Sequence, residues 1–252
     1  MIHLKSLREI DAMRRAGAIT GQALLAARRV IEPGVTTKQV DSEVRRAIRK
    51  AGATPAFLGY GGFPGNCCVS VNDEVIHGIP GRRVLRAGDI VSIDVGAVWD
   101  GYYGDAAATF PVGDVPEEAK RLIRVARECF YKGIAFAREG VHVSDISCAV
   151  QTHAEKNGFS VVREWTGHGV GSKLHEEPEV PNFGDPGHGP RLRRGMTFAV
   201  EPMINAGGCD VRTKSDGWTV VTLDGGWSAH FEHTILVTSD LPDLLTDWEG
   251  TA

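Results

Sequence analysis

Four carboxylates and one histidine stand in stretches of this sequence where charged side chains are unexpected. Asp94 and Glu201 lie inside apolar, strand-like runs, Asp105 and Glu232 lie beside similar runs, and His168 has glycines on both sides. A lone buried carboxylate costs several kcal/mol unless it is paired or bound to a metal. Each acid alone could equally be an inward-facing charge or a local ion pair. Together, carboxylates and imidazole suit two bridged divalent ions, a centre that activates water and polarises a carbonyl.

A predicted hairpin brings two of these acids together. The Asp-Gly dipeptide at residues 100–101 is a strong signal for a two-residue turn, with strands on both sides over roughly residues 90–112. In that register Asp94 faces Ala107, and Asp105 is a diagonal neighbour on the same face, at a backbone distance of about 7–8 Å. Two like charges so close require a cation or a shared proton.

An internal repeat relates the two halves of the chain and places Asp94 and Glu201 at equivalent positions. We therefore expect one α/β domain over residues 1–252, in which the two strands that bear these acids meet at a shared centre. Its pseudo-twofold halves, roughly 6–112 and 116–237, are expected to pack a curved antiparallel sheet against four helices. The matched segments are 34–52 with 140–158 and 85–94 with 192–201.

The elements that must position these residues are indicated by capping residues, breaks and apolar periodicity. Helices are predicted from Leu7 to Val30 after a Ser6 capping box, from a Thr37 cap to Gly52, from Pro116 to about Arg138, and from a Ser144 cap to Asn157. Strands are predicted at residues 68–71, 75–77, 161–165, 196–204, 219–223 and 231–237, besides the hairpin. Residues 54–65 and 176–195 are rich in glycine and proline and are expected to be loops.

The bulk composition indicates an ordinary globular protein. The chain has 252 residues and a formal net charge of −4, which gives no nucleic-acid footprint. No apolar run reaches the length of about 18 residues that a transmembrane helix needs, and no signal peptide is recognisable. The five scattered cysteines form no CxxC pair, so we expect reduced thiols and a cytoplasmic location.

The chain resembles the type I methionine aminopeptidases of peptidase family M24, in their short bacterial form, over nearly its whole length. The motifs that carry the resemblance are residues 75–80, 93–95, 101–105, 167–171, 175–178, 198–202 and 231–234. The resemblance implies a pita-bread (creatinase/aminopeptidase) fold and removal of the initiator methionine when the second residue is small. It also implies two divalent ions (Co, Mn, Fe, Ni or Zn), and cellular availability selects among them. The implied ligands are Asp94, Asp105, His168, Glu201 and Glu232.

The same resemblance assigns catalytic roles. It implies that a hydroxide bridging the two metals attacks the scissile carbonyl, with Glu201 as general base. His77 and His175 would hold the substrate and its tetrahedral intermediate, since a neutral imidazole N–H near a developing oxyanion stabilises it. His230 lies two residues before Glu232 and could point to the same side, but the resemblance gives it no role.

The resemblance further implies a methionine pocket with apolar, sulfur-tolerant walls. Several positions depart from the commonest family pattern, with Phe57 for Cys, Phe63 for Tyr, Leu174 for Phe and Gly61 for a frequent His. For Phe57 and Leu174, plain core packing is an equally good interpretation. The implied pocket residues are Phe57, Tyr60, Phe63, Cys68, Leu174 and Trp218. Hydroxyl residues near the ligands are replaced by Gly96, Ala106, Ala107 and Ala199.

The resemblance implies a monomer that acts on nascent polypeptide N-termini near the ribosome exit, without membrane or direct nucleic-acid contact. Two alternatives remain at this point. X-Pro dipeptidases and aminopeptidases P share the ligand set but carry an extra N-terminal domain, of which this chain shows no trace. A metal-free interaction protein on the same fold would be expected to have lost ligands, and all five are present.

Overall fold

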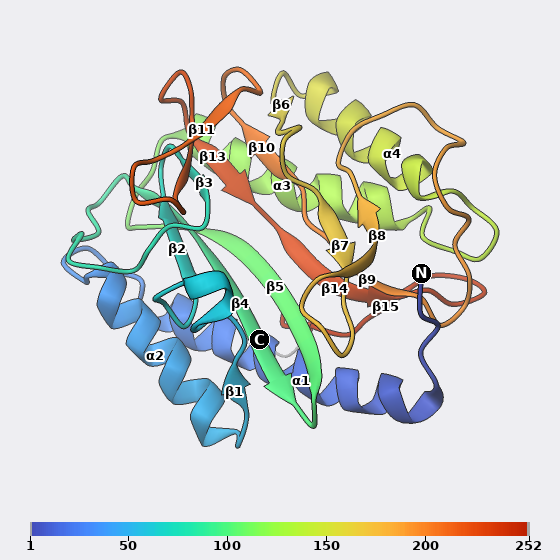
Figure 1. The fold of residues 1–252 in the computed structure, drawn as a ribbon. Coiled ribbons are helices and arrows are strands. Elements are labelled where there is room, and N and C mark those ends of the chain that lie inside the picture. The colour runs from blue at the N-terminus through green and yellow to red at the C-terminus, as the bar shows by residue number, and fades with distance from the viewer. Residues whose placement is uncertain (1, 251–252) are drawn as a thin grey trace.

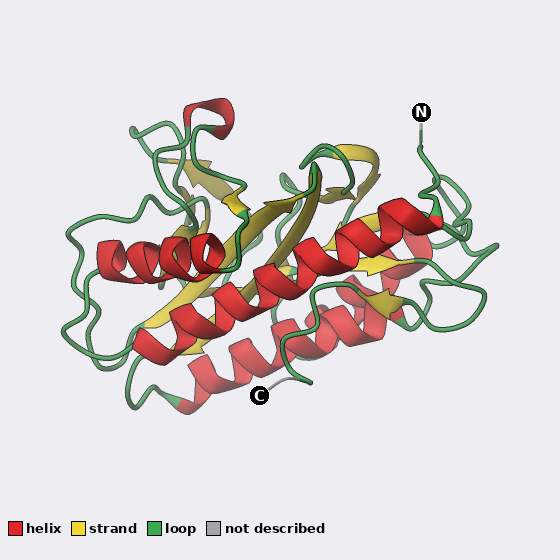
Figure 2. Ribbon diagram, turned by 90° about the horizontal axis from the view of Figure 1, so that it is seen from below, coloured by secondary structure: helices red, strands yellow, loops and turns green. Residues whose placement is uncertain are grey.

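The computed structural model describes residues 2–250 and arranges them as helices on one face of a curved sheet (Figures 1 and 2). Helix α1 (Leu7–Val30) lies against the hairpin strands β4 and β5, and α2 (Thr37–Lys50) packs beside α1. Helices α3 (Glu117–Ile134) and α4 (Val143–Lys156) form a second packed pair. Among the described residues, no helix is both long and apolar enough to cross a membrane.

The helices begin and end close to their predicted positions, with three corrections. Thr36, and not Thr37, caps α2, because the Thr36 hydroxyl accepts the Gln39 N–H while the Thr37 hydroxyl binds the carbonyl of Gly81. Helix α3 ends at Ile134 and not near Arg138.

The N-cap of α4 is the third correction. The helix begins after His142, whose N–H donates to the Asp145 carboxylate at 2.9 Å. Ser144, which the sequence analysis placed at the cap, lies inside the first turn, and its hydroxyl accepts the His188 N–H at 2.7 Å. A side chain three residues into a helix can satisfy a free N–H as well as a cap can.

The main sheet has nine strands in the order β1-β4-β5-β14-β9-β7-β8, with β2 on β4 and β15 on β14, and all of these pairs are antiparallel. Two three-stranded sheets, β13-β10-β6 and β11-β12-β3, lie beside it. The strands are β1 (Thr54–Pro55), β2 (Cys68–Val71), β3 (Glu74–Ile76), β4 (Ile90–Trp99), β5 (Tyr102–Pro111), β6 (Ser160–Val161), β7 (Gly167–Gly169), β8 (Glu176–Val180), β9 (Thr197–Val200), β10 (Met203–Asn205), β11 (Val211–Thr213), β12 (Val220–Thr222), β13 (Ser228–His230), β14 (Glu232–Leu236) and β15 (Asp243–Leu244).

The predicted hairpin register is confirmed. Trp99 pairs with Tyr102 and Asp94 pairs with Ala107. Asp100 and Gly101 have φ angles of 49° and 77°, the left-handed conformation that a two-residue hairpin turn of this type needs at both positions. The turn chemistry therefore fixes which face each acid occupies.

Several predicted strands are wrong in extent. The strand expected at 161–165 is replaced by the short β6 and β7, and the strand at 196–204 is divided into β9 and β10 at Pro202, which cannot donate a ladder hydrogen bond. Residues 176–195 are not all loop, because β8 forms the sheet edge, where its proline is tolerated. The 54–65 segment contains the two-residue β1 and a short 3₁₀ turn, Tyr60–Gly62.

The two halves meet at β5 and β14, which are neighbours at the centre of the sheet. The strands of Asp94 and Glu201, β4 and β9, flank this central pair and do not pair with each other, but both acids reach one cavity at the expected shared centre. The core fills the space between the helices and the sheet, with Leu24, Ile93 and Phe130 among its fully buried side chains. This core anchors the strands whose opposite face carries the acids.

Candidate metal centre

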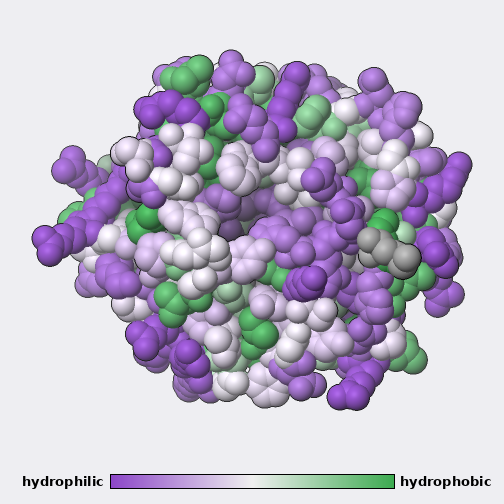
Figure 3. Space-filling view, viewed as in Figure 1, coloured by the Kyte–Doolittle hydropathy of each residue, from purple (hydrophilic) through white to green (hydrophobic). Residues whose placement is uncertain are grey.

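Five neighbouring strands each supply one of the five predicted ligand residues. In sheet order, Asp94 lies in β4, Asp105 in β5, Glu232 in β14, Glu201 directly after β9, and His168 in β7. All five line one cavity of about 330 Å³. Figure 3 shows a hollow near the middle of the molecular face turned to the viewer in Figure 1, opposite the helices. Curvature of the sheet thus brings together side chains that are far apart in the sequence.

The spacing of the ligand atoms fits a shared cation better than direct hydrogen bonds. His168 Nε2 lies 3.5 Å from Glu201 Oε1 and 3.9 Å from Asp105 Oδ2. These separations exceed the usual range of about 2.7–3.2 Å for a hydrogen bond. One ligand atom each from Asp105, His168 and Glu232 lies within 4.8 Å of the others, a group that could hold an ion.

Burial is the main cause of the raised pKa of all four acids. Burial raises the pKa of Asp94 to about 7. Burial, with the nearby carboxylates, holds the pKa of Asp105, Glu201 and Glu232 well above the usual range. Oxygens of Asp94, Asp105 and Glu232 are buried with no hydrogen-bond partner among the described residues. The protein's own groups leave this charge unbalanced, so the donor set fits divalent cations.

The tautomer and the pKa of His168 suit a neutral metal ligand. Its Nδ1–H donates to the carbonyl of Gly169 at 3.0 Å, which leaves the lone pair of Nε2 directed at the acids. Burial and the neighbouring His175 lower the pKa of His168 to about 4. A backbone carbonyl that fixes the tautomer in this way is typical of metal-binding histidines.

The two other predicted histidines line the same cavity. The His77 ring lies edge-to-face against Trp165 at a centroid distance of 4.9 Å. His175 Nδ1 lies 2.6 Å from the Tyr60 hydroxyl, and burial raises the pKa of Tyr60, which keeps the phenol protonated. Burial and His175 lower the pKa of His77 to about 4, and burial lowers that of His175. Both imidazoles are therefore neutral at pH 7.

All six predicted pocket residues line the cavity beside the acids. Phe57, Phe63, Cys68 and Leu174 form one buried apolar cluster, and Trp218 packs against it. Further lining residues were not predicted, and only Trp165 had a signal, as an aromatic three positions before the glycine-flanked His168. The missed lining residues are Ile76, Trp165, Thr166, Thr213 and Gly217.

Two departures from the family pattern, Gly96 and Phe57, are sterically linked. A Cβ added to Gly96 would lie 2.7 Å from the Phe57 ring and 2.8 Å from Ala56 Cβ. The larger Phe57 side chain therefore occupies space that any side chain at position 96 would need. Phe57 lines the pocket and also belongs to the buried apolar cluster, so its expected core-packing and pocket roles coincide.

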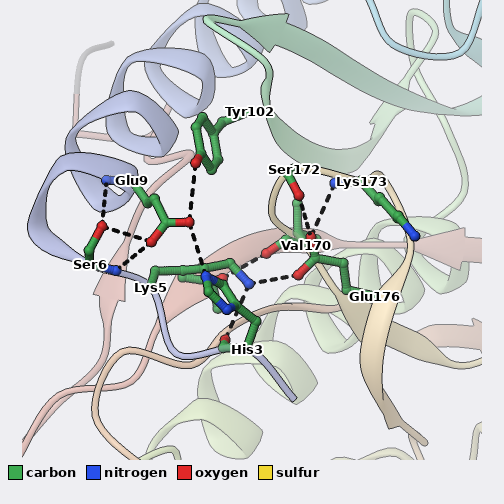
Figure 4. A network of polar contacts seen from close by, with 10 residues as sticks. His3, Lys5, Ser6, Glu9, Tyr102, Val170, Ser172, Lys173 and Glu176 are labelled. Atoms are coloured by element: carbon green, nitrogen blue, oxygen red, sulfur yellow. Dashed lines mark hydrogen bonds and ion pairs between the residues drawn. The ribbon is translucent and has the colours of Figure 1, made fainter. Parts of the chain in front are cut away.

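A buried ion pair ties the N-terminal arm to the turn that carries His175 (Figure 4). Lys5 Nζ lies 2.6 Å from Glu176 Oε2, and the two side chains are 2% and 15% exposed. Burial would raise the pKa of Glu176, but Lys5 holds it below its usual value. The second carboxylate oxygen of Glu176 accepts the N–H of Lys173 at 3.1 Å. A Cβ at Gly171 would lie 2.5 Å from both Lys5 Cε and Glu176 Oε1, so the contact leaves no spare room.

We expect Lys5→Met to lower the free energy of unfolding by about 3 kcal/mol, because it leaves the Glu176 carboxylate buried without its partner. The double variant Lys5→Met/Glu176→Gln removes that charge and should recover most of the loss. Urea unfolding measures both values. Lys120→Met is the matched control, because its ion pair with Glu117 is exposed and should contribute little. A single variant as stable as wild type would show that the pair is not a constraint on this turn.

Known proteins resemble this chain along its whole length. A family model described as metallopeptidase family M24 matches residues 11–239. Methionine aminopeptidase 1 of Bacillus subtilis is 52% identical over 246 residues, which cover 98% of this chain and 99% of the relative. The crystal structure of methionine aminopeptidase from Thermotoga maritima is 48% identical, with a TM-score of 0.97 and coverage of 98% of this chain and 100% of that chain.

A solved structure with low sequence identity shares the fold of this chain. Prolidase from Pyrococcus furiosus is 22% identical, has a TM-score of 0.80, and matches 97% of this chain but 65% of its own length. The fold is therefore shared by prolidases and methionine aminopeptidases, whereas the sequence identity of this chain is much higher to the methionine aminopeptidases. These similarities confirm the resemblance and the architecture expected from the sequence.

Proposed function

Because this chain belongs to the methionine aminopeptidases of metallopeptidase family M24, we propose that it removes the initiator methionine from new polypeptides whose second residue is small. One observation carries the proposal beyond family membership. Five adjacent strands direct four carboxylates and an imidazole into a cavity that is also lined by a buried apolar cluster. Such a site places a hydrolytic centre beside a compartment for an unbranched, sulfur-containing side chain.

We propose that the site holds two divalent ions. Bound ions would supply a water-derived nucleophile at neutral pH and polarise the scissile carbonyl. The unpartnered buried oxygens and raised pKa values support this, since a cation relieves the repulsion between the acids. Mn, Fe, Co, Ni and Zn all accept this mixture of ligands. The residues that would hold them are Asp94, Asp105, His168, Glu201 and Glu232.

Glu201 is the proposed general base. Its side chain is 11% exposed and lines the pocket, and one oxygen faces His168. The raised pKa of Glu201, caused by burial and by Asp94, suits a group that must take a proton at neutral pH. The carboxylate would accept the proton of the attacking water and pass it to the leaving amine nitrogen.

His77 and His175 are proposed to bind the substrate and stabilise the tetrahedral intermediate. We propose that the Tyr60 O–H donates to His175 Nδ1, which places the proton of this neutral ring on Nε2. That N–H can then donate to the oxygen of the scissile carbonyl as negative charge develops on it. Packing against Trp165 limits the orientation of His77.

The proposed substrate indicates where in the cell the reaction takes place. The N-terminus of a newly made chain is the substrate, so we propose that the protein acts in the cytoplasm, as a monomer, on nascent chains near the ribosome exit. The fold also occurs in prolidase-type enzymes, which makes cleavage before proline the alternative activity to be tested.

The deciding experiment compares two peptide substrates. Metal-reconstituted protein is expected to release methionine from Met-Ala-Ser and to leave Ala-Pro dipeptides intact. Product formation can be followed by chromatography under identical metal and pH conditions. A preference for the Ala-Pro substrate would assign the chain to the proline-specific activity instead.

A further inference from the structure

One buried histidine at the site remains without a role in the proposed mechanism. His230, the last residue of β13, is 2% exposed. Its Nε2 lies 3.7 Å from Glu201 Oε2 and 3.9 Å from Glu232 Oε2, and it has no hydrogen-bond partner among the described residues. Buried polar atoms without partners are rare in native proteins, so each one calls for a physical explanation.

The backbone around His230 holds the imidazole in place. The His230 N–H donates to the Thr109 hydroxyl at 2.8 Å, and that hydroxyl lies 3.0 Å from the His230 carbonyl oxygen. Strand β13 also pairs with β10, with Met203 opposite His230. The ring therefore approaches the acids from a strand outside the row of five that carries the predicted ligands. It is a second, independent imidazole at the same carboxylates.

Glu201 lies between two imidazoles that approach different oxygens. His168 Nε2 is 3.5 Å from Oε1, whereas His230 Nε2 is 3.7 Å from Oε2. The two imidazole rings differ in their hydrogen bonds and in their capacity to bind an ion. His168 donates through Nδ1 and presents a lone pair at Nε2, and its Nε2 belongs to the described group of atoms that could hold an ion. His230 is in no such group within residues 2–250.

We propose that His230 is a positioning residue that donates its Nε2–H to Oε2 of Glu201 and thereby turns Oε1 toward His168 and the metal site. The inference rests on the proposed function and adds a role to it. A shortening of the 3.7 Å separation to about 2.9 Å would make a normal charge-assisted hydrogen bond. Donors behind metal ligands commonly change metal affinity or activity about 10–100-fold when they are removed.

Two substitutions separate positioning from packing. His230→Leu keeps an apolar body of similar size but removes the donor, and it should weaken Mn(II) binding in calorimetry about 10–100-fold. It should also lower kcat on Met-Ala-Ser with little change in KM, because the pocket is untouched. His230→Gln keeps an N–H donor of similar reach and should recover metal affinity and kcat to within a few-fold of wild type.

His233→Leu is the matched control. His233 is equally buried, but its Nδ1 lies 3.0 Å from the Thr246 hydroxyl and its ring packs among Phe130 and Trp248, away from the acids. This variant should lower the unfolding temperature and leave the Mn(II) affinity of the folded protein unchanged.

The inference is overturned if His230→Leu binds Mn(II) as tightly as wild type, or if the Leu and Gln variants behave alike. Packing alone would favour Leu over Gln at this buried position. Calorimetry needs no substrate, so the His230 result stands apart from the proposed activity. If wild type fails to cleave Met-Ala-Ser, the proposed function fails. If wild type cleaves it and the Leu variant matches wild type, only the role of His230 fails.

Discussion

Asp105→Asn is expected to abolish peptide hydrolysis and to make the metal-free protein more stable. The activity should fall more than about 10³-fold, because without a properly held ion the attacking water loses most of the drop in pKa from 15.7 to about 7 that a metal can provide. Stability should rise because Asp105 is held beside Asp94 and Glu201, and neutralising one carboxylate removes repulsion from all of them. A variant that is inactive yet more stable would indicate that the carboxylates are held together to bind metal.

The measurement compares Met-Ala-Ser turnover in Mn(II) with the unfolding temperature in a chelator. Glu232→Gln is a second ligand variant and should behave in the same way, since burial and its neighbours also raise its pKa. Asp185→Asn, at an exposed position, is the control and should change neither quantity. Wild-type turnover in either ligand variant would contradict the dinuclear interpretation.

The metal-free protein is expected to lose stability as the pH rises above about 6.5. Asp94 has a usual pKa of 3.8 and a folded pKa of about 7, so between these values the folded state holds a proton that the unfolded state has released. Stability from such a group is present at low pH and is lost as the pH rises through the folded value. Burial also raises the pKa values of the other three acids, so they change the stability in the same direction.

Buried histidines make the protein more stable as the pH rises, but they do so at lower pH than the acids act. The pKa values of His77 and His168 are lowered from 6.5 to about 4, so their contribution rises between about pH 4 and 6.5 and is complete above it. The window above pH 6.5 therefore reports the buried acids. In chelator, calorimetry should show the unfolding temperature falling across this window, with a shallower fall in Asp105→Asn.

Divalent metal should reverse this loss, because it binds the ionised acids of the folded state. At a free concentration 1,000 times its Kd, one ion adds about 4 kcal/mol to the free energy of unfolding. The metal-induced gain should thus be greater at pH 8 than at pH 6. A metal-free protein that gained stability above pH 6.5 would show that the acids are not held together unpaired.

The hairpin that carries Asp94 and Asp105 was predictable because short local sequence signals determine its geometry. The Asp-Gly turn set the register that pairs Asp94 with Ala107, and the structure follows it. The Ser6 capping box likewise set the start of α1. In both cases a few adjacent residues determine the geometry, and no distant contact competes with them.

Features that depend on long-range pairing were missed or misplaced. Strands of two or three residues, such as β6 and β7, are too short to show an alternating pattern and exist because distant strands pair with them. The central β5–β14 pair joins segments more than a hundred residues apart, so the sequence indicated two symmetric halves but not which strands touch. His230 had no predictable role for the same reason, since its position depends on β10.

The most direct test of the central claim is a metal titration of metal-depleted protein. Bound Mn(II) or Co(II) and methionine released from Met-Ala-Ser would be measured in the same samples. We expect activity to appear only as metal binds, with saturation at two ions per chain and Asp94, Asp105, His168, Glu201 and Glu232 all required. Failure to bind either metal, together with no methionine release, would instead identify a metal-free protein on this fold.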